Sequence, residues 1–399
     1  MNTKIENNTL TLYLEGRIDS NNAAQVEQEA LSAVAGAPGA ALALDAEGLE
    51  YISSAGLRVL MKLRKQAGKA LPVWNVSPEV YEIFEVTGFT DLLEVHKALR
   101  VISVEGREKI GQGGNGAVYR IDEDTIVKVY KPWMKLPDIQ RERDFARTAF
   151  VNGIPSVIAF DVVKVPTEDG ECLGVVFEML KSDTLGAAIR EHPEKMDEYV
   201  DKYVALAKTL HTTHVPSGSF TRIQDVLHHH ADGMKPWLTE EEVALLHSII
   251  DDIPEADTVT HNDLHPGNIM IQDGELVLID MPEVTMGPPI CDLVSIFRDM
   301  ISAPSGAESS TIERSVGMPK ELILAVGNKF FMKYTGITDP AELQEYYKKL
   351  GLLFAFNVSL VAGSGAENAV RLAPVLVEKL FRGVVVPNEQ AIRYLFKTM

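Results

Sequence analysis

Short β-rich runs alternate with amphipathic stretches over the first hundred residues of the chain. Between residues 54 and 66, for example, Leu57, Leu60 and Met61 recur at the spacing that places side chains on one face of a helix. This alternation predicts α/β layering, in which helices pack on a sheet. We expect strands at residues 9–14, 41–45 and 72–76, and helices at residues 23–34, 54–66 and 78–87.

The rest of the chain opens with further β-like runs and closes with helical patterns. Residues 117–121 and 126–130 are β-like, and so are residues 269–272 and 275–280, which flank Asp273-Gly274. An Asp-Gly pair between two such runs favours a tight hairpin, which brings the two ends of the segment together. Beyond about residue 320 the pattern is helical, with an expected core of Phe330, Phe331, Tyr334, Tyr346, Tyr347, Leu350 and Phe354.

The length of the chain indicates more than one domain, because 399 residues exceed the roughly 100 to 200 residues of an ordinary domain. We expect divisions into residues 1–102, 103–180 and 181–399. A content of 46% hydrophobic and 24% charged residues is typical of a folded globular protein and argues against disorder.

The charge of the chain narrows the classes of ligand. A formal net charge of −19 would repel a phosphate backbone, so we expect no nucleic-acid binding, whereas a cationic small substrate would suit it better. No run of about 18 apolar residues occurs, and no basic segment followed by an apolar core begins the chain. We therefore predict no membrane association and a cytoplasmic location.

The cysteines and histidines do not indicate a metal site. Cys172 and Cys291 are too few for a framework of disulfides and lack metal-ligand spacing, so we interpret them as reduced thiols. His211, His214 and residues 228–230 have no cysteine or His-Glu-x-x-His pattern beside them. We interpret these histidines as solvated or core side chains.

Residues 51–60 follow an expected strand and enter an expected helix, with Ser53 and Ser54 at the junction. Together with Gly16-Arg17-Ile18-Asp19-Ser20, this segment resembles the STAS domains of bacterial anti-sigma-factor antagonists. In that family a partner kinase phosphorylates a serine at the helix start, and the matching position is Ser54. Ser53 stands where the family frequently has Asp. The alternative is that Ser53 or Ser54 serves only as a helix N-cap, the commonest role of serine at such a position.

A glycine-rich run at residues 111–116 leads into a β-like segment and then a turn, an order that fits a β-hairpin over phosphates better than a dinucleotide-binding helix. Lys128 then lies within an otherwise apolar strand. A buried lysine needs an anion, and the candidates are ATP phosphates and a carboxylate of the following helix, where we favour Glu142 over Asp144.

The strongest chemical signal is the run of residues 261–268, which precedes the predicted Asp-Gly hairpin. That hairpin would bring Asp263, Asn268 and Asp280 together. Asp263 could accept a hydroxyl proton, while Asn268 and Asp280 offer the hard oxygen ligands that Mg²⁺ prefers. The cluster suits phosphoryl transfer.

Residues from about 107 to 300 resemble the protein-kinase-like superfamily, and within it most closely the aminoglycoside and choline phosphotransferases. Asn262 replaces the arginine usual in protein kinases, Met281-Pro282 replaces Phe-Gly, and no Ala-Pro-Glu motif occurs, which favours the small-molecule branch. By this resemblance His265 could contact the substrate or a phosphate, or could brace the catalytic loop by hydrogen bonds, and Asp292 is expected to support the loop. The resemblance also implies a nucleotide site formed by Gly111, Gly113, Gly114, Gly116, Val118, Lys128 and the backbone of Glu178 and Leu180.

The predicted fold is therefore an α/β STAS-like domain followed by an α+β, two-lobed kinase-like domain with a mostly helical C-terminal lobe. The favoured function is ATP- and Mg²⁺-dependent phosphotransfer to an alcohol group, with the STAS-like domain binding an anti-sigma factor or similar protein. Two alternatives stay open. One is a protein serine kinase that acts on Ser54, and the other is a nucleotide-binding adaptor or anti-sigma-factor antagonist with an inactive kinase fold.

Overall fold

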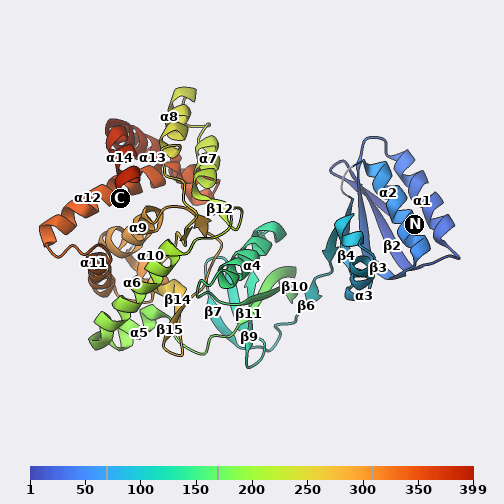
Figure 1. The fold of residues 1–399 in the computed structure, drawn as a ribbon, viewed down its shortest axis with the longest axis horizontal. Coiled ribbons are helices and arrows are strands. Elements are labelled where there is room, and N and C mark those ends of the chain that lie inside the picture. Colours follow the sequence, from blue (N-terminus) through green and yellow to red (C-terminus); the bar gives the residue numbers. More distant parts are fainter. Residues whose placement is uncertain (69–70, 169, 307–308) are drawn as a thin grey trace. The chain divides into compact units, whose positions relative to one another are not determined.

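The computed structural model describes residues 1–68, 71–168, 170–306 and 309–399. These residues form two compact units, Met1–Ile102 and Ser103–Met399, which Figure 1 shows as ribbons. In the described parts of the chain, no helix is both long enough and apolar enough to cross a membrane.

The first unit is a five-stranded sheet with helices packed on it. The strand order is β1-β2-β3-β4-β5, in which β1 is antiparallel to β2 and the later pairs are parallel. Its core holds fully buried leucines of β2, β3 and α2. This arrangement confirms the predicted α/β fold. The elements are β1 (Asn2–Glu6), β2 (Thr9–Ile18), α1 (Ala23–Gly36), β3 (Ala41–Ile52), α2 (Ser54–Ala67), β4 (Pro72–Val76), α3 (Pro78–Val86) and β5 (Glu94–Lys97).

Strands β2 and β3 are longer than the sequence pattern predicted, because each continues past its apolar run. The pairing register of the two strands shifts between Tyr13 and Glu15 and again between Gly16 and Arg17. Gly16 has a φ of 62°, a left-handed conformation that glycine adopts without strain. Glu15, Gly16 and Arg17 therefore form a bulged extension of β2.

The second unit begins with an antiparallel sheet on which one helix packs. Its strands lie in the order β10-β11-β9-β8-β7. Helix α4 contacts β10 and β11. The elements are β7 (Lys109–Gln112), β8 (Gly116–Arg120), β9 (Thr125–Tyr130), α4 (Leu136–Val151), β10 (Ala159–Thr167) and β11 (Gly170–Glu178).

The remainder of this unit is mostly helical, as predicted (Figure 1). Two small sheets interrupt the helices: the hairpin β14 (Ile269–Gln272) and β15 (Glu275–Leu278), and the short strands β12 (Thr221–Arg222), β16 (Thr285–Met286) and β13 (Val259–Thr260). The helices are α5 (Leu185–Glu191), α6 (Met196–Thr212), α7 (Ile223–Gly233), α8 (Glu240–Ile250), α9 (Ile290–Phe297), α10 (Ser309–Val316), α11 (Lys320–Thr335), α12 (Pro340–Leu360), α13 (Glu367–Leu376) and α14 (Glu389–Thr398).

Helix α7 packs backbone to backbone against the 3₁₀ turn η6 (Val361–Ser364). A Cβ atom on Gly363 would lie 1.8 Å from the carbonyl oxygen of His230, and one on Gly233 would lie 2.1 Å from the carbonyl oxygen of Gly363. Neither backbone can move aside as a flexible side chain would. Both glycines are therefore required for the position of α7.

We predict that Gly363→Ala destabilises the protein by about 1–3 kcal/mol, because the added methyl group overpacks this contact. The matched control is Gly351→Ala within α12, where a Cβ would meet nothing within 4 Å. There the higher helix propensity of alanine should raise stability by up to about 1 kcal/mol. Urea unfolding followed by circular dichroism measures both, and equal effects of the two substitutions would refute the close contact.

Candidate active site

Lys128 is the centre of a partly buried group of charges between the sheet and the hairpin. Its Nζ atom lies 2.7 Å from Oε1 of Glu142 on α4 and 2.8 Å from Oδ1 of Asp280. Burial disfavours the charged lysine, but the two carboxylates outweigh burial and raise the pKa of Lys128. Asp144, the other carboxylate considered, contacts the neighbouring Arg143 instead.

The glycine-rich segment forms the hairpin of β7 and β8, in which Gly111 is opposite Val118 and the N–H of Gly113 donates to the carbonyl of Gly116. A Cβ on Gly116 would lie 2.1 Å from a carbonyl oxygen of β9, so sheet packing alone requires this glycine. Gly113 and Gly114 differ, because a Cβ on either would meet nothing within 4 Å. The hairpin tip therefore has open space beside its backbone.

The segment expected to bind adenine follows the end of β11. The N–H of Glu178 donates to the carbonyl of Ile158 at 3.0 Å, and the Glu178 carboxylate accepts the Ile158 N–H at 2.7 Å. The N–H of Met179 donates to the carbonyl of Asp124. Because the Glu178 N–H is already engaged, the group of its backbone that could bind a nucleotide is the carbonyl. Leu180, two residues on, is partly exposed.

The hairpin brings Asp263, Asn268 and Asp280 together. The Asn268 side-chain N–H donates to Oδ2 of Asp263 at 2.8 Å and to its main-chain carbonyl at 3.0 Å. The N–H of Ile279 donates to the carbonyl of Asn268, which places Asp280 beside it. Asp273 at the turn has a φ of 52°, and Gly274 follows with 86°, as a tight Asp-Gly hairpin requires.

Asp292 supports the start of the catalytic loop by accepting hydrogen bonds from its backbone. Its carboxylate is fully buried and accepts the backbone N–H groups of His261 and Asn262 at 2.9 and 2.5 Å. It also contacts Nε2 of His211 at 3.1 Å, while Nδ1 of His211 contacts the Tyr334 hydroxyl. His211, which the sequence analysis interpreted as a solvated or core side chain, is buried and is part of the support for this loop.

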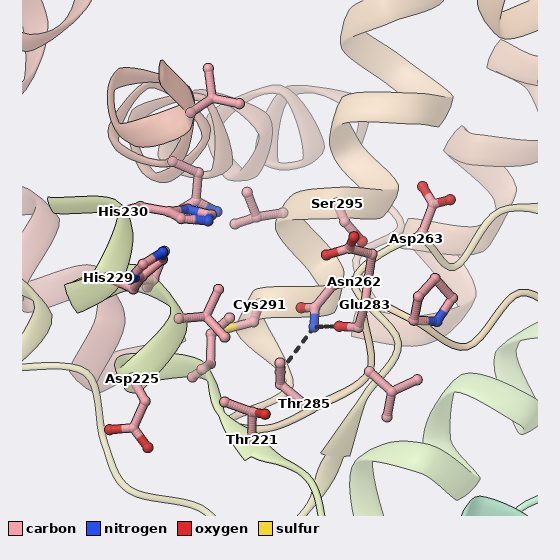
Figure 2. A pocket seen from close by; sticks show the side chains of 18 of the residues that line it. Thr221, Asp225, His229, His230, Asn262, Asp263, Glu283, Thr285, Cys291 and Ser295 are labelled. Atoms are coloured by element: carbon pink, nitrogen blue, oxygen red, sulfur yellow. Dashed lines mark hydrogen bonds between the residues drawn. The ribbon is translucent and has the colours of Figure 1, made fainter. Parts of the chain in front are cut away.

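Asn262 links the catalytic loop to the segment that follows Asp280. Its φ is 62°, a left-handed conformation that asparagine tolerates better than most residues, and Asp280 has the same value. The Asn262 side chain donates to the carbonyl of Glu283 at 2.8 Å and to Oγ1 of Thr285 at 2.9 Å (Figure 2). Asn262, which replaces the arginine usual in protein kinases, thus has a structural role in this chain.

Arg298, which the sequence did not single out, contacts the central carboxylate. One of its terminal nitrogens lies 2.8 Å from Oδ1 of Asp263, and its guanidinium binds both carboxylate oxygens of Asp299 at 2.7 Å. Burial alone would lower the pKa of Arg298, but Asp299 and Asp263 raise it. Donors therefore reach both oxygens of Asp263, Arg298 on one and Asn268 on the other.

His265 braces the loop by hydrogen bonds. Its Nδ1 accepts the N–H of Gly267 at 3.1 Å, and its Nε2 contacts the Ser315 hydroxyl at 3.2 Å. A Cβ on Gly267 would lie 2.0 Å from the carbonyl oxygen of Ser315, so the loop lies directly against α10. Nε2 of His265 is 3.8 Å from Asp263.

A cavity of about 800 Å³ opens beside Asp263 (Figure 2). Its lining comes from α4, α7, α9, α12 and the loops that carry Asn262, Asp263 and Glu283. Lys128, Asn268 and Asp280 are not part of the lining. Of these four side chains, only Asp263 therefore lines the cavity.

Comparison with known families gives this arrangement a context. Residues 107–317, more than half of the chain, match the family described as the phosphotransferase enzyme family. The chain belongs to that family. Residues 1–94 of this phosphotransferase match the family described as Mlab, STAS domain. Both resemblances inferred from the sequence are confirmed.

Curated relatives match the STAS segment of the phosphotransferase. BtrV of Bordetella bronchiseptica, whose name describes it as an anti-sigma factor antagonist, is 39% identical over 89 residues, which cover 22% of this chain and 76% of BtrV. The anti-sigma-B factor antagonist of Listeria monocytogenes is 29% identical over 89 residues, covering 22% of this chain and 77% of that protein.

Solved structures similar to the phosphotransferase include an ADP-bound aminoglycoside phosphotransferase, with 15% identity, 79% of this chain and 98% of that chain covered, and a TM-score of 0.44. A choline/ethanolamine kinase family protein from Mesorhizobium loti has 14% identity, 73% and 92% coverage, and a TM-score of 0.41. Scores this low carry no inference about what the present chain binds.

The oxygen atoms near Asp263 fit Mg²⁺. Because the Asn268 amide nitrogen donates to Asp263, the Oδ1 atom of Asn268 is left as a neutral oxygen that can ligate a metal ion. Asp280 adds a carboxylate whose pKa Lys128 lowers against the opposing effect of burial. Mg²⁺ takes few protein oxygens and keeps several waters. Within the described ranges no group of three or more His, Cys, Asp or Glu side chains suits a metal, so a site here would use this sparser set.

Ser54 lies exposed at the first turn of α2. The N-cap is Ser53, whose hydroxyl accepts the N–H groups of Ala55 and Gly56 at 3.2 and 3.4 Å. Capping thus falls to Ser53 alone. Ser54 is thus at a helix end where free N–H groups and the helix dipole favour a negative charge.

We predict that Asp292→Asn costs the phosphotransferase about 3 kcal/mol of stability, because it leaves buried N–H groups facing an amide instead of a carboxylate. The control is Asp257→Asn, whose exposed carboxylate contacts His214 at the surface and should matter little. Urea unfolding of both variants checks this. Equal unfolding midpoints would show that Asp292 does not support the loop.

Proposed function

We propose that the protein transfers the γ-phosphoryl group of ATP to a hydroxyl acceptor. The observation that carries the proposal is one unbroken series of contacts, in which Asp263 contacts Asn268, the adjoining hairpin brings in Asp280, and Asp280 contacts Lys128. The series ends in a cavity on the side of Asp263. Membership of the phosphotransferase enzyme family supports the same reaction class.

On the nucleotide side, the proposal assigns phosphate binding to Lys128 and to the hairpin that includes Gly113 and Gly114. The ammonium of Lys128 is held charged and oriented by Glu142, and the open space at the hairpin tip admits phosphate oxygens close to backbone N–H groups. Gly111, Gly116 and Val118 shape the hairpin around this tip. The carbonyl of Glu178 and the backbone N–H of Leu180 are proposed to bind adenine.

Asn268 and Asp280 are proposed to hold Mg²⁺, which when bound supplies charge neutralisation at the phosphates. On the acceptor side, Asp263 accepts the hydroxyl proton. The hydroxyl oxygen forms a bond to the γ-phosphorus, the bond from that phosphorus to the bridging oxygen of ADP breaks, and ADP leaves. Arg298 and Asn268 orient the Asp263 carboxylate for this step, each by donating a hydrogen bond to one of its oxygens.

We predict that Asp280→Asn abolishes the Mg²⁺-dependent part of the binding of the fluorescent analogue TNP-ATP. Asp263→Asn should leave that binding intact and slow the release of ADP from ATP, with water as acceptor, by about 100-fold or more. Fluorescence titration and a coupled ADP assay measure the two effects. Absent binding by the wild type, or binding indifferent to Asp280→Asn, would contradict the proposal and favour an adaptor that does not use this site.

A second candidate function is a protein serine kinase whose acceptor is Ser54. The exposure of Ser54, together with the capping of α2 by Ser53, supports it, because the Ser54 hydroxyl is free to react. A phosphate there would meet the N-terminus of α2 and add charge to a surface through which the STAS domain would bind an anti-sigma factor or similar protein.

Intact-mass and peptide mass spectrometry after incubation with ATP and Mg²⁺ separates the two candidates. If Ser54 is the acceptor, the wild type gains one phosphoryl group at Ser54, which Ser54→Ala and Asp280→Asn both lose and Ser53→Ala keeps. An unchanged mass in a wild type that binds TNP-ATP excludes self-phosphorylation. It leaves a small-molecule kinase or a nucleotide-binding adaptor, which a screen of acceptors separates.

A further inference from the structure

Helix α7 forms one wall of the cavity beside Asp263. Several of its side chains line the cavity, and Figure 2 shows His229 and His230 at this wall. The helix packs backbone to backbone on η6 through Gly233 and Gly363. It also packs on α8, which Figure 1 shows beside it. The contact between α7 and α8 therefore helps to fix the position of a cavity wall.

Two histidine rings face each other across this contact. The Nδ1 atom of His228 on α7 lies 2.7 Å from the Nδ1 atom of His247 on α8. The ring centres are 5.0 Å apart, and the ring planes differ by 22°. The difference between the two distances is about twice the distance from the centre of an imidazole ring to its nitrogen. Both Nδ1 atoms therefore lie close to the line between the ring centres, and the rings meet edge to edge.

This geometry requires one proton between the two nitrogens. Two Nδ1 atoms without a proton would turn their lone pairs on each other at 2.7 Å, and two protonated ones would bring two N–H groups into collision. One N–H and one lone pair form a hydrogen bond of ordinary length. A chelated metal ion fits less well, because it would need both lone pairs to point at a third position instead of at each other.

Carboxylates lie beside the other nitrogen of each ring. Nε2 of His228 is 3.2 Å from Asp251, and Nε2 of His247 is 3.4 Å from Asp232. Lys235 chiefly, and His247 to a smaller extent, lower the pKa of Asp232, which is therefore ionised near pH 7. An ionised carboxylate favours a proton on the nitrogen that faces it. With both Nε2 atoms protonated and one proton shared between the Nδ1 atoms, the two rings hold a single positive charge.

Other charged groups around the two helices contact partners of their own. These ion pairs are those of Arg222 on β12 with Asp225, of Arg393 and Lys397 on α14 with Asp252, and of Arg382 on η7 (Val377–Val385) with Glu242. The residues of η6, and those of α12 that line the cavity, have no titratable side chain. Arg222, and more weakly His228, lower the pKa of the cavity residue Asp225, so the charge of the histidine pair is felt at the wall.

We propose that His228 and His247 form a pH-sensitive latch between α7 and α8, which is closed while the two rings share one proton and is released when acid adds a second. In the released state both Nδ1 atoms are protonated, the rings repel each other, and α7 loses a contact that holds the cavity wall. Histidine ordinarily changes its charge between about pH 5 and 8, so mild acidification is the condition that tests the latch. The latch is independent of the phosphotransferase reaction proposed above, since it concerns the position of the wall only.

Cys291 reports the position of the wall, because its buried thiol lines the same cavity. In a full-length protein with Cys172→Ser, Cys291 is the one remaining thiol. Its rate of reaction with 4,4′-dithiodipyridine is measured at about pH 7.5 and about pH 5.5 and divided by the rate for glutathione, which removes the change in thiolate fraction. This ratio should rise about tenfold at the lower pH, the effect of losing one hydrogen bond to a charged group.

Two further substitutions in the same background assign the rise to the histidine pair. His247→Gln removes the ring that shares the proton, so the ratio should no longer depend on pH, whether the glutamine holds the wall or leaves it loose. His214→Gln is the matched control, because His214 also faces a carboxylate, that of Asp257 at 2.7 Å, but lies exposed and has no second ring as partner. This control should keep the full rise. Circular dichroism at both pH values shows that each protein is folded.

The latch is refuted if the ratio is the same at both pH values in the protein with both histidines, or if the rise survives His247→Gln. A thiol that reacts at neither pH refutes it as well, since the wall then stays in place under acid. Loss of the helical circular dichroism signal at the lower pH would show that acid unfolds the whole domain, which also excludes a local latch. A rise that His247→Gln abolishes and His214→Gln retains supports it.

Discussion

The arrangement of the catalytic loop depends on one buried carboxylate, that of Asp292. A charge without solvent contact is costly unless donors surround it, and here two backbone N–H groups and His211 do so. This fixes the conformation of Asn262, which has a positive φ, and thereby the direction of the next residue, Asp263. The Asn262 side chain in turn donates a hydrogen bond to the carbonyl of Glu283, which ties the position of that residue to the catalytic loop. A single buried anion thus aligns both the loop that carries Asp263 and the loop that follows Asp280.

A second balance of charge surrounds Lys128. Its ammonium contacts Glu142 and Asp280, so neither the cation nor the two anions is left without a partner of opposite sign. Glu142 is almost fully buried, whereas the Asp280 side chain is 41% exposed. The contact with Glu142 is therefore the fixed one. The contact with Asp280 is open to exchange, because water or another ligand can reach that carboxylate.

Local patterns in the sequence predicted much of the fold. The helices and strands of the first unit, the hairpin at Asp273-Gly274 and the helical C-terminal part all depend on periodicity or on turn chemistry within a few residues. The bulged extension of β2 past Gly16 was missed because its residues have turn-like composition. Such a bulge is set by the partner strand and leaves no periodic signal.

The residues of the candidate site also differ in whether the sequence alone could identify them. Lys128, Asp263, Asn268 and Asp280 could be selected because their spacing along the chain is characteristic, and the structure brings them together. Their roles remain predictions. Arg298 could not be selected, since it is an ordinary charged residue whose meaning arises from a contact with a distant segment of the chain. The ion pair between Arg298 and Asp263 is visible only in three dimensions.

The division of the chain into two compact units at residue 102 also bears on stoichiometry. Because the STAS domain and the phosphotransferase domain are parts of one polypeptide, they are made in a ratio of one to one at every level of expression. Any encounter between two tethered domains is unimolecular, and its rate does not depend on the concentration of the protein in the cell. The number of STAS domains available to a binding partner therefore always equals the number of phosphotransferase domains.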